Sequence, residues 1–339
     1  MITPRFSSLL LFASSALGMR IATWNLRFDS KPDNITVQQS IDKLPDPLTE
    51  FPFLELHGEQ PWSTRRLRVS ETLLSEGIEL AGFQEALNRQ VNDLDQLFGD
   101  DWSWIGVGRD DGKEAGEYSP IFFKNSSFSL VSWDSFWLSN TPFEPSKFPG
   151  AGSIRICTAA RFNVTNPAPG TPNSFSYLNT HFDDQSDDQR KLGASLLLTR
   201  AKYEAVKNGG PVFITGDFNS PSTGSDSGGY SIITGASPPV AINTTFAQKF
   251  STGNEGGGDF KMLDLRGQAP RQAVSKNFAT FTGFTEPADT SDWSRIDFVF
   301  GGSNKQWRAD GYKVLSALQD DGMLSSDHRP VFADVVLQS

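Results

Sequence analysis

The segment Gly216-Asp217-Phe218-Asn219 places two polar side chains that could do chemistry directly after an apolar run. On an extended backbone Asp217 and Asn219 would point the same way, because they alternate around Phe218. A carboxylate in this position can activate a water molecule, and an amide can orient that water or a phosphate. Glycine, aspartate and asparagine are also common turn formers, so the segment taken alone fits an ordinary turn at least as well.

Two further carboxylates stand in similar settings. Glu85 follows the apolar run 80–83, and Asp327 precedes His328 in Ser-Asp-His-Arg-Pro. Magnesium sites use hard oxygen ligands, usually one or two carboxylates, so Glu85 and Asp327 are candidate metal ligands. A solvated loop acid or a helix cap explains Glu85 equally well.

The chain has only three histidines, and two of them follow or precede predicted strands. His328 could contact a phosphate while a separate carboxylate orients its ring. His181 ends a predicted strand, whereas His57 lies in a long loop and is interpreted as a surface residue. A single histidine is more often structural than catalytic, so His181 and His328 gain weight only together with their companions.

These residues require strands and helices to position them. Apolar alternation and flanking turn residues predict strands over 20–26, 80–85, 102–107, 119–124, 127–138, 155–164, 175–181, 211–215, 295–300 and 331–337. Helical spacing predicts helices over 62–76, 87–98 and 187–207, the last capped by Asp187. The stretch 29–60 shows no helical period and is predicted to be a surface loop that faces the substrate. Run 211–215 is almost wholly apolar, which is typical of a strand buried on both faces.

Composition favours a large core and disfavours one class of function. Hydrophobic residues make up 37% of the 339 residues, with 27 Phe and 8 Trp. The net charge of −10 argues against a protein that holds nucleic acid mainly through its phosphates, since that mode needs lysine and arginine. A bound metal ion can still supply local positive charge. The only cysteine, Cys157, is expected to be a small buried apolar residue.

The first 18 residues resemble a signal peptide. Arg5 precedes an apolar run over 9–17, and Ala16-Leu17-Gly18 fits a cleavage site. We therefore expect a signal peptide over 1–18, a single domain over 19–339 and a secreted protein, although a simple apolar N-terminus is the alternative. The run is too short to span a membrane, so no integral membrane anchor is expected. Asparagines in N-x-S/T triplets, as in a glycoprotein, are Asn34, Asn125, Asn163 and Asn243.

Six short motifs together resemble the endonuclease/exonuclease/phosphatase superfamily, which has the DNase I-like fold. In chain order they are Thr-Trp-Asn-Leu-Arg, Phe-Gln-Glu, Asn-Thr-His-Phe-Asp, Gly-Asp-Phe-Asn-Ser, Arg-Ile-Asp-Phe-Val-Phe and Ser-Asp-His-Arg-Pro. The resemblance covers about Arg20 to Val336. It implies a four-layer α/β/β/α sandwich with two central mixed β-sheets and a metal site at one edge of the sheets.

The resemblance also implies a role for each motif residue. Asn25, Glu85 and Asp327 would lie at a Mg²⁺ ion, with Mn²⁺ as a possible substitute, and Asn25 would also touch the substrate phosphate. Carried over in the same way, the catalytic set is Asp217 activating water, Asn219 orienting the phosphate, His181 and His328 stabilising the transition state, and Asp297 holding the tautomer of His328.

Within the superfamily the chain is similar to a branch of small members, in which Glu117 and Arg155 would face the substrate. A strand-edge acid and a surface base are equally good interpretations of these two residues. Where relatives often have His-x-Asp-His, this chain has His181-Phe182-Asp183-Asp184. This change removes a possible imidazole and adds an acid, so it bears on substrate preference.

The leading hypothesis is a secreted, Mg²⁺-dependent phosphoric ester hydrolase, either a phosphodiesterase or nuclease or a phosphatase. Its substrate would be nucleic acid, a lipid head-group or a small sugar or inositol phosphate, and no stable protein partner is predicted. The rival is a catalytically silent secreted binding protein on the same fold. Loss of Glu85, Asp217 or His328 would have favoured the rival, and all three are present.

Overall fold

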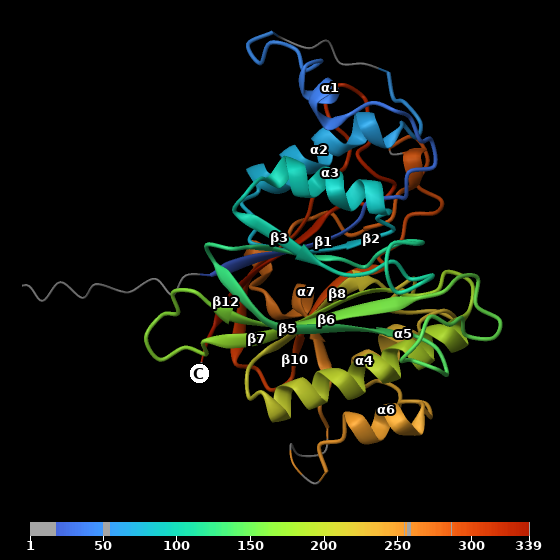
Figure 1. The fold of residues 1–339 in the computed structure, drawn as a ribbon, viewed down its shortest axis with the longest axis vertical. Helices are drawn as coiled ribbons and strands as arrows, with labels where there is room; N and C mark the ends of the chain where they lie inside the picture. Colours follow the sequence, from blue (N-terminus) through green and yellow to red (C-terminus); the bar gives the residue numbers. More distant parts are fainter. Residues whose placement is uncertain (1–17, 50–54, 254, 256–258, 286, 339) are drawn as a thin grey trace, which may run out of the picture.

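Two six-stranded β-sheets lie face to face in the computed structural model, and helices cover their outer faces (Figure 1). The structure describes residues 18–49, 55–253, 255, 259–285 and 287–338. Apart from Gly18, the expected signal peptide lies outside the described residues. The arrangement is the four-layer α/β/β/α sandwich that the motifs implied, so that prediction is confirmed.

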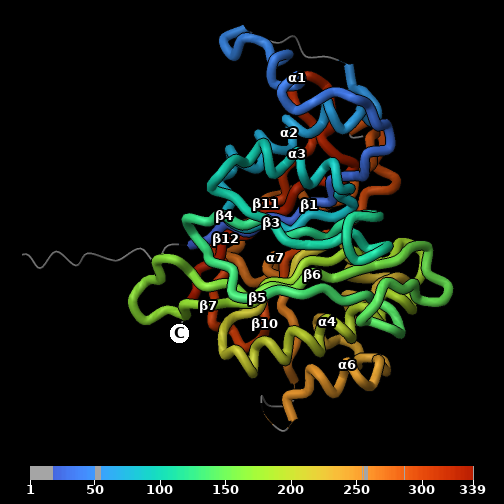
Figure 2. Tube along the Cα trace, in the orientation of Figure 1, coloured from blue at the N-terminus to red at the C-terminus, as the bar shows by residue number. Residues whose placement is uncertain are grey.

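The first sheet contains strands from both ends of the chain. Its order is β11 (Trp307–Val314), β12 (Val331–Leu337), β1 (Met19–Asn25), β2 (Leu80–Gln84), β4 (Ile121–Lys124) and β3 (Trp102–Ile105). Its outer face carries α1 (Val37–Ile41), α2 (Trp62–Ser75) and α3 (Asn88–Phe98). β1 pairs with β12 antiparallel and with β2 parallel, and Arg20 lies opposite Asp334. Figure 2 accordingly shows the blue N-terminal strand beside the red C-terminal one.

The second sheet is built from the middle of the chain and one later strand. Its order is β5 (Phe128–Trp137), β6 (Ile156–Val164), β7 (Ser174–His181), β8 (Val212–Asp217), β10 (Asp297–Gly302) and β9 (Met262–Asp264). Its outer face carries α4 (Asp187–Lys207), α5 (Gly228–Ile233) and α6 (Thr244–Lys249), while the one-turn α7 (Leu265–Gln268) packs against β10 and β11.

Apolar residues fill three layers, one between the sheets and one under each set of helices. In β1, Ile21 faces the other sheet and Ala22 faces the helices, as the two-residue repeat of a strand requires. In β8, Phe213 lies between the sheets while Val212 and Ile214 pack under α4. The prediction that this strand is buried on both faces is therefore confirmed. Cys157 is fully buried, also as expected.

The structure differs from the predicted elements in several places. The stretch 29–60 contains a short helix, α1, because Thr36 and Gln39 form a capping box at its start. Ser186 caps α4, and Asp187 is its first residue instead of its cap. Strands β9 and β11 and the short helices α5, α6 and α7 were not predicted. Among the described residues, no helix is long and apolar enough to cross a membrane.

Candidate active site

Strand ends from both sheets meet around one cavity of about 700 Å³. The parallel strands β7 and β8 end together, and the antiparallel β10 begins there, so their terminal residues His181, Asp217 and Asp297 are direct neighbours in register. The first sheet brings the end of β1, the residue after β2 and the residues before β12 to the same edge. Those residues are Asn25, Glu85, Asp327 and His328. The predicted catalytic and metal residues are thus brought together.

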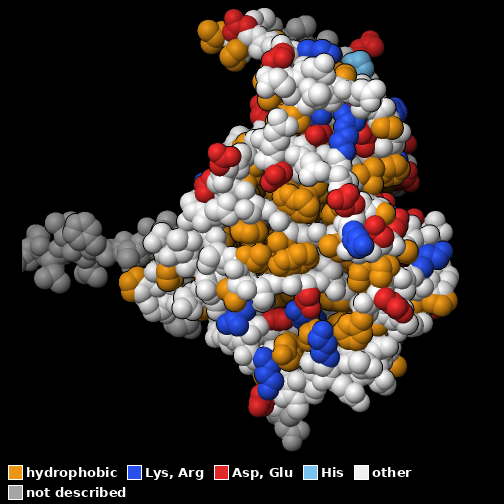
Figure 3. Space-filling model, in the orientation of Figure 1, with side chains coloured by type: hydrophobic (Ala, Val, Ile, Leu, Met, Phe, Trp, Pro, Cys, Tyr) orange, Lys and Arg blue, Asp and Glu red, His pale blue; other side chains and the backbone are white. Residues whose placement is uncertain are grey.

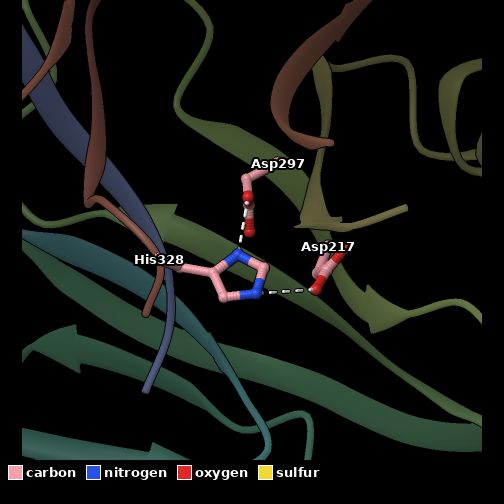
Figure 4. A group of neighbouring side chains, drawn as sticks. All are labelled: Asp217, Asp297 and His328. Atoms are coloured by element: carbon pink, nitrogen blue, oxygen red, sulfur yellow. Dashed lines mark hydrogen bonds and ion pairs between the residues drawn. The ribbon is translucent and has the colours of Figure 1, made fainter. Parts of the chain in front are cut away.

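His328 lies between two carboxylates (Figure 4). Its Nδ1 is 2.9 Å from Asp297 Oδ2, and its Nε2 is 3.6 Å from Asp217 Oδ2. Burial opposes protonation of the ring, but the negative charges of Asp297 and Asp217 outweigh it and raise the pKa of His328 to about 10. Burial and the charge of Asp297 raise the pKa of Asp217 to about 7. His328 is therefore a cation at neutral pH, beside a carboxyl group that can take up a proton there.

His181 has different surroundings. Its Nε2 is 3.5 Å from Asp217 Oδ2 and 3.1 Å from Asn219 Nδ2, and its Nδ1 is 3.0 Å from Arg155 Nη1. Burial, together with the positive charges of Arg155 and Arg109, lowers the pKa of His181. The two histidines of the cavity are therefore in opposite charge states near neutral pH.

Asn25 connects the two sheets at the base of the cavity. Its Nδ2 donates to Glu85 Oε1 and to Asp217 Oδ2, at 3.0 Å in each case. The other carboxylate oxygen of Glu85 accepts from the backbone N–H of Phe28 at 3.1 Å. Ser326 Oγ donates to the carbonyl of Asn25 at 2.6 Å, which joins the segment before β12 to the end of β1.

Unusual backbone conformations concentrate at this cavity. Four of the described non-glycine residues have a positive φ. Three of them line the cavity: Arg27 (55°), Glu85 (59°) and Asn219 (44°). Such conformations cost about 1 kcal/mol or more for residues with a Cβ and persist where the surroundings fix them. The strand ends are therefore bent to aim these side chains into the cavity.

The cavity carries many more carboxylates than cations. Its lining includes seven carboxylates and two arginines, besides the two histidines. Asp327 is among them; burial raises its pKa, and Glu85 adds to the shift against the opposing charge of His328. The structure also contains a possible metal-binding triad, Asp217, Asp297 and His328, whose ligand atoms lie within 4.8 Å of one another. An excess of hard oxygen ligands of this kind fits a divalent cation.

Glu117 and Arg155, the two predicted substrate contacts, both line the cavity. Glu117 accepts from Arg109 Nη1 at 2.5 Å, and burial raises its pKa to about 7 despite that partner. Arg155 is only 5% exposed, and all three of its guanidinium nitrogens face partners inside the protein. Arg155 is therefore not the surface base that the sequence left open as an alternative.

Several residues that support the site were not identified from the sequence. Arg65 on α2 is almost fully buried and holds the loop after β1 against the segment before β12. Its guanidinium donates to the carbonyls of Leu26, Arg27, Phe28, Gln60 and Ser325. The position of Arg65 on the core-facing side of the predicted helix 62–76 was the feature of the sequence that could have identified it.

Behind the cavity a buried polar network joins the sheets. Gln84 Nε2 donates to Asn179 Oδ1 at 2.7 Å, and Asn179 Nδ2 donates to the carbonyls of Phe83 and Pro120. A Cβ on Gly82 would lie 2.4 Å from Asn179 Oδ1, so the sheets approach closely here only because residue 82 is glycine. Asn179 belongs to one of the six motifs, and its structural role is to link the two sheets.

The two facing sheets and the cavity at their common edge define a DNase I-like α/β sandwich. The chain belongs to the Endonuclease/Exonuclease/phosphatase family, whose model matches residues 22–328. Members of this family are phosphoesterases, and the recognition made from the six motifs is confirmed. A comparison with curated proteins finds no significant match.

Solved structures agree with this assignment. An endonuclease/exonuclease/phosphatase of Bacteroides vulgatus is 27% identical, with a TM-score of 0.70 over 95% of this chain and 100% of that one. A mannosyl-6-phosphatase of Bacteroides thetaiotaomicron is 24% identical, with a TM-score of 0.68 over 94% and 100%. TDP2 of D. rerio with a single-strand DNA product is 13% identical, with a TM-score of 0.58 over 94% and 98%. The last two similarities concern the fold alone.

Proposed function

We propose that this protein is a divalent-metal-dependent phosphoesterase that hydrolyses phosphodiester or phosphomonoester bonds through an activated water molecule. The observation that carries the proposal is the contact of Asp217 with residues of both sheets at the cavity. Its Oδ2 lies 3.0 Å from Asn25 Nδ2, 3.5 Å from His181 Nε2 and 3.6 Å from His328 Nε2. A carboxylate surrounded by one amide and two imidazoles matches a general base with charge-stabilising neighbours.

In this mechanism the oxygen of a water molecule forms the new bond to phosphorus while its proton passes to Asp217. The bond between phosphorus and the leaving oxygen breaks, and the leaving alcohol takes up a proton from solvent. A pKa of about 7 suits Asp217 to this task, since a general base works best near the operating pH. Asn25 and Asn219 orient the phosphoryl group, and His328 offers positive charge to its oxygens.

A divalent cation fits the carboxylate-rich side of the cavity. Asn25, Glu85 and Asp327 provide oxygen ligands of the type that Mg²⁺ and Mn²⁺ prefer. We favour these residues over the triad of Asp217, Asp297 and His328, because the two ring nitrogens of His328 already face the carboxylates of Asp297 and Asp217, at 2.9 Å and 3.6 Å. When bound, the cation supplies positive charge that polarises the phosphoryl oxygens.

The charge distribution favours a small phosphate ester over a long nucleic acid. Nucleic-acid binding needs basic side chains along the backbone path. On the face seen in Figure 3, basic side chains are scattered among acidic ones. The exposed carboxylates of Asp184 and Asp226 border the cavity. Its volume of about 700 Å³ suits a small molecule, and a sugar or inositol phosphate or a lipid head-group therefore ranks ahead of DNA.

We also propose that the protein is secreted and glycosylated. Asn34, Asn125 and Asn163 are exposed in the structure, as glycan acceptors must be. Asn243 instead caps α6 and donates to the carbonyl of Asn140, so it is the least suitable acceptor. Expression of the full chain in a eukaryotic secretory host would place it in the medium, with a mass that falls on endoglycosidase treatment. Retention inside the cells without glycans would contradict this proposal.

The enzymatic proposal is tested with a phosphodiester and a phosphomonoester of p-nitrophenol. Turnover is measured with Mg²⁺ or Mn²⁺, with a chelator, and in the Asp217→Ala variant. Asp188→Asn, an exposed change on α4, is the matched control. We expect metal-dependent turnover that Asp217→Ala abolishes and Asp188→Asn leaves unchanged. Activity that survives both the chelator and Asp217→Ala would overturn the mechanism, and no turnover of either ester would favour the silent binding protein.

A further inference from the structure

Each ring nitrogen of His181 faces a hydrogen-bond donor. Arg155 Nη1 lies 3.0 Å from Nδ1, and Asn219 Nδ2 lies 3.1 Å from Nε2. A neutral imidazole has one N–H group and one acceptor nitrogen, so it can accept from only one of these donors. The surroundings keep the ring neutral, since burial and two nearby arginines lower its pKa. One of the two contacts must therefore decide where the single proton sits.

Arg155 is the donor that cannot turn away. Its Nη2 lies 2.8 Å from Asp184 Oδ1, and its Nε lies 3.4 Å from Asp183 Oδ1. Asp183 is itself fully buried and held by the backbone N–H groups of Gly152 and Ser153. A guanidinium is always charged in proteins and has no acceptor atom, so the nitrogen it faces has to accept.

Asn219 is the weaker of the two competitors. Its Nδ2 also donates to the carbonyl of Phe182 at 3.0 Å, so it keeps a partner if the contact with His181 is lost. It is also uncharged, and charge-assisted hydrogen bonds are roughly twice as strong as neutral ones. The contact with Arg155 therefore prevails over the contact with Asn219.

The opposite tautomer lacks a good acceptor. A proton on Nδ1 would have to reach Glu117 Oε2 at 3.8 Å, which is beyond hydrogen-bond range. Glu117 is also already engaged by Arg109 at 2.5 Å. That proton would in addition point at the guanidinium of Arg155. A proton on Nε2 faces Asp217 Oδ2 at 3.5 Å on the side of the cavity.

We propose that Arg155 is a positioning residue that holds His181 in the tautomer protonated at Nε2, so that the ring presents an N–H donor to the phosphate ester. This inference rests on the proposed function for the identity of the acceptor, but not for the tautomer itself. It gives the two histidines different tasks. His328 brings positive charge, whereas His181 donates one directed hydrogen bond.

The tautomer can be measured directly by long-range ¹H–¹⁵N correlation NMR on the ¹⁵N-labelled protein without metal. The chain has three histidines, so His57→Gln and His181→Gln assign the ring signals. In the unmodified protein we expect the ¹⁵N shift of an unprotonated nitrogen at Nδ1 of His181 and of a protonated one at Nε2. The reverse pattern would overturn the proposal, and this readout needs neither a variant of Arg155 nor any turnover.

Two variants test whether Arg155 is the cause. Arg155→Met should shift His181 towards the tautomer protonated at Nδ1 or a mixture of both, while Arg155→Lys, which keeps a charged donor, should retain the original pattern. An unchanged pattern in a folded Arg155→Met protein would contradict the inference. Asp184→Asn is a milder variant that loosens Arg155 without removing it, and it should produce a smaller shift in the same direction.

Kinetics separate positioning from substrate binding. We expect Arg155→Met to lower kcat for the model ester by about 10- to 100-fold with KM within about twofold, and Arg155→Lys to restore most of it. A raised KM with unchanged kcat would instead assign Arg155 to substrate binding. If the unmodified protein hydrolyses no ester, the proposed function fails while the NMR result still decides the tautomer.

Discussion

Asp297 Oδ2 lies 2.9 Å from His328 Nδ1, and both side chains are buried where β10 begins and β12 is about to begin. The two residues come from different sheets, so the bond crosses the interface between them. It holds the ring so that the Nδ1 proton points at Asp297 and Nε2 points towards Asp217. A hydrogen bond of this kind orients a catalytic imidazole and stabilises its charged form.

Asp297→Asn is expected to lower kcat by about 100- to 10,000-fold. The uncharged amide no longer stabilises the positive charge of His328, and its NH₂ group can face Nδ1 where the carboxylate oxygen was. The fold should persist, since the substituted side chain has the same size. Steady-state kinetics, with circular dichroism as a check of folding, measure the effect. Asp310→Asn, a change at an exposed ion pair, is the control. Activity within twofold of the unmodified protein would remove Asp297 from the mechanism.

Glu85→Gln is expected to weaken Mn²⁺ binding by about tenfold or more, because it removes one of the negative charges proposed at the cation. The amide oxygen introduced by this substitution can accept from Asn25 or from the backbone N–H of Phe28 but not from both, so circular dichroism checks that the fold is retained. Isothermal titration with Mn²⁺ measures the affinity without any substrate. Thermal unfolding should show the same trend, since a cation that binds only the folded state raises the Tm of the unmodified protein more. Equal affinities would place the cation elsewhere.

Asn179→Leu is expected to reduce the free energy of unfolding by roughly 3 kcal/mol. The substitution removes the acceptor of the Gln84 side chain and the donor to the buried carbonyls of Phe83 and Pro120. Urea unfolding measures the change. Asn163→Ser, at an exposed position of β6, should change stability by no more than about 0.5 kcal/mol. A small effect at Asn179 would mean that the network between the sheets contributes little.

Acidification should destabilise the protein partly through Asp183. Burial opposes ionisation of this carboxyl group, but the N–H groups of Gly152 and Ser153 and the charge of Arg155 outweigh it and lower its pKa. A lowered folded-state pKa gives stability that is present above the unfolded value of about 3.9 and is lost as pH falls through the folded value. Asp183→Asn should therefore be less stable at pH about 6, and the difference should shrink by pH about 3. A difference that is constant with pH would contradict this assignment.

The site residues that lie at the ends of strands could be predicted from the sequence. Asp217 and Glu85 follow apolar runs whose length and pattern define strands, and strand ends meet at the edge of a sheet. The partners of these residues could not be predicted. That Arg155 faces His181 depends on the register of β6 on β7, and that Arg65 reaches five carbonyls depends on how α2 packs. The short helix α1 was missed because its start depends on a local cap and not on apolar spacing.

The pairing of β1 with β12 joins residues about as far apart in the sequence as the chain allows, with Arg20 opposite Asp334. During synthesis the strand that carries Asn25 cannot gain this neighbour until the last strand has left the ribosome. The same holds for Asp327 and His328, which lie just before that last strand. A chain truncated before β12 would therefore lack Asp327 and His328 at the cavity or the strand that holds them beside β1.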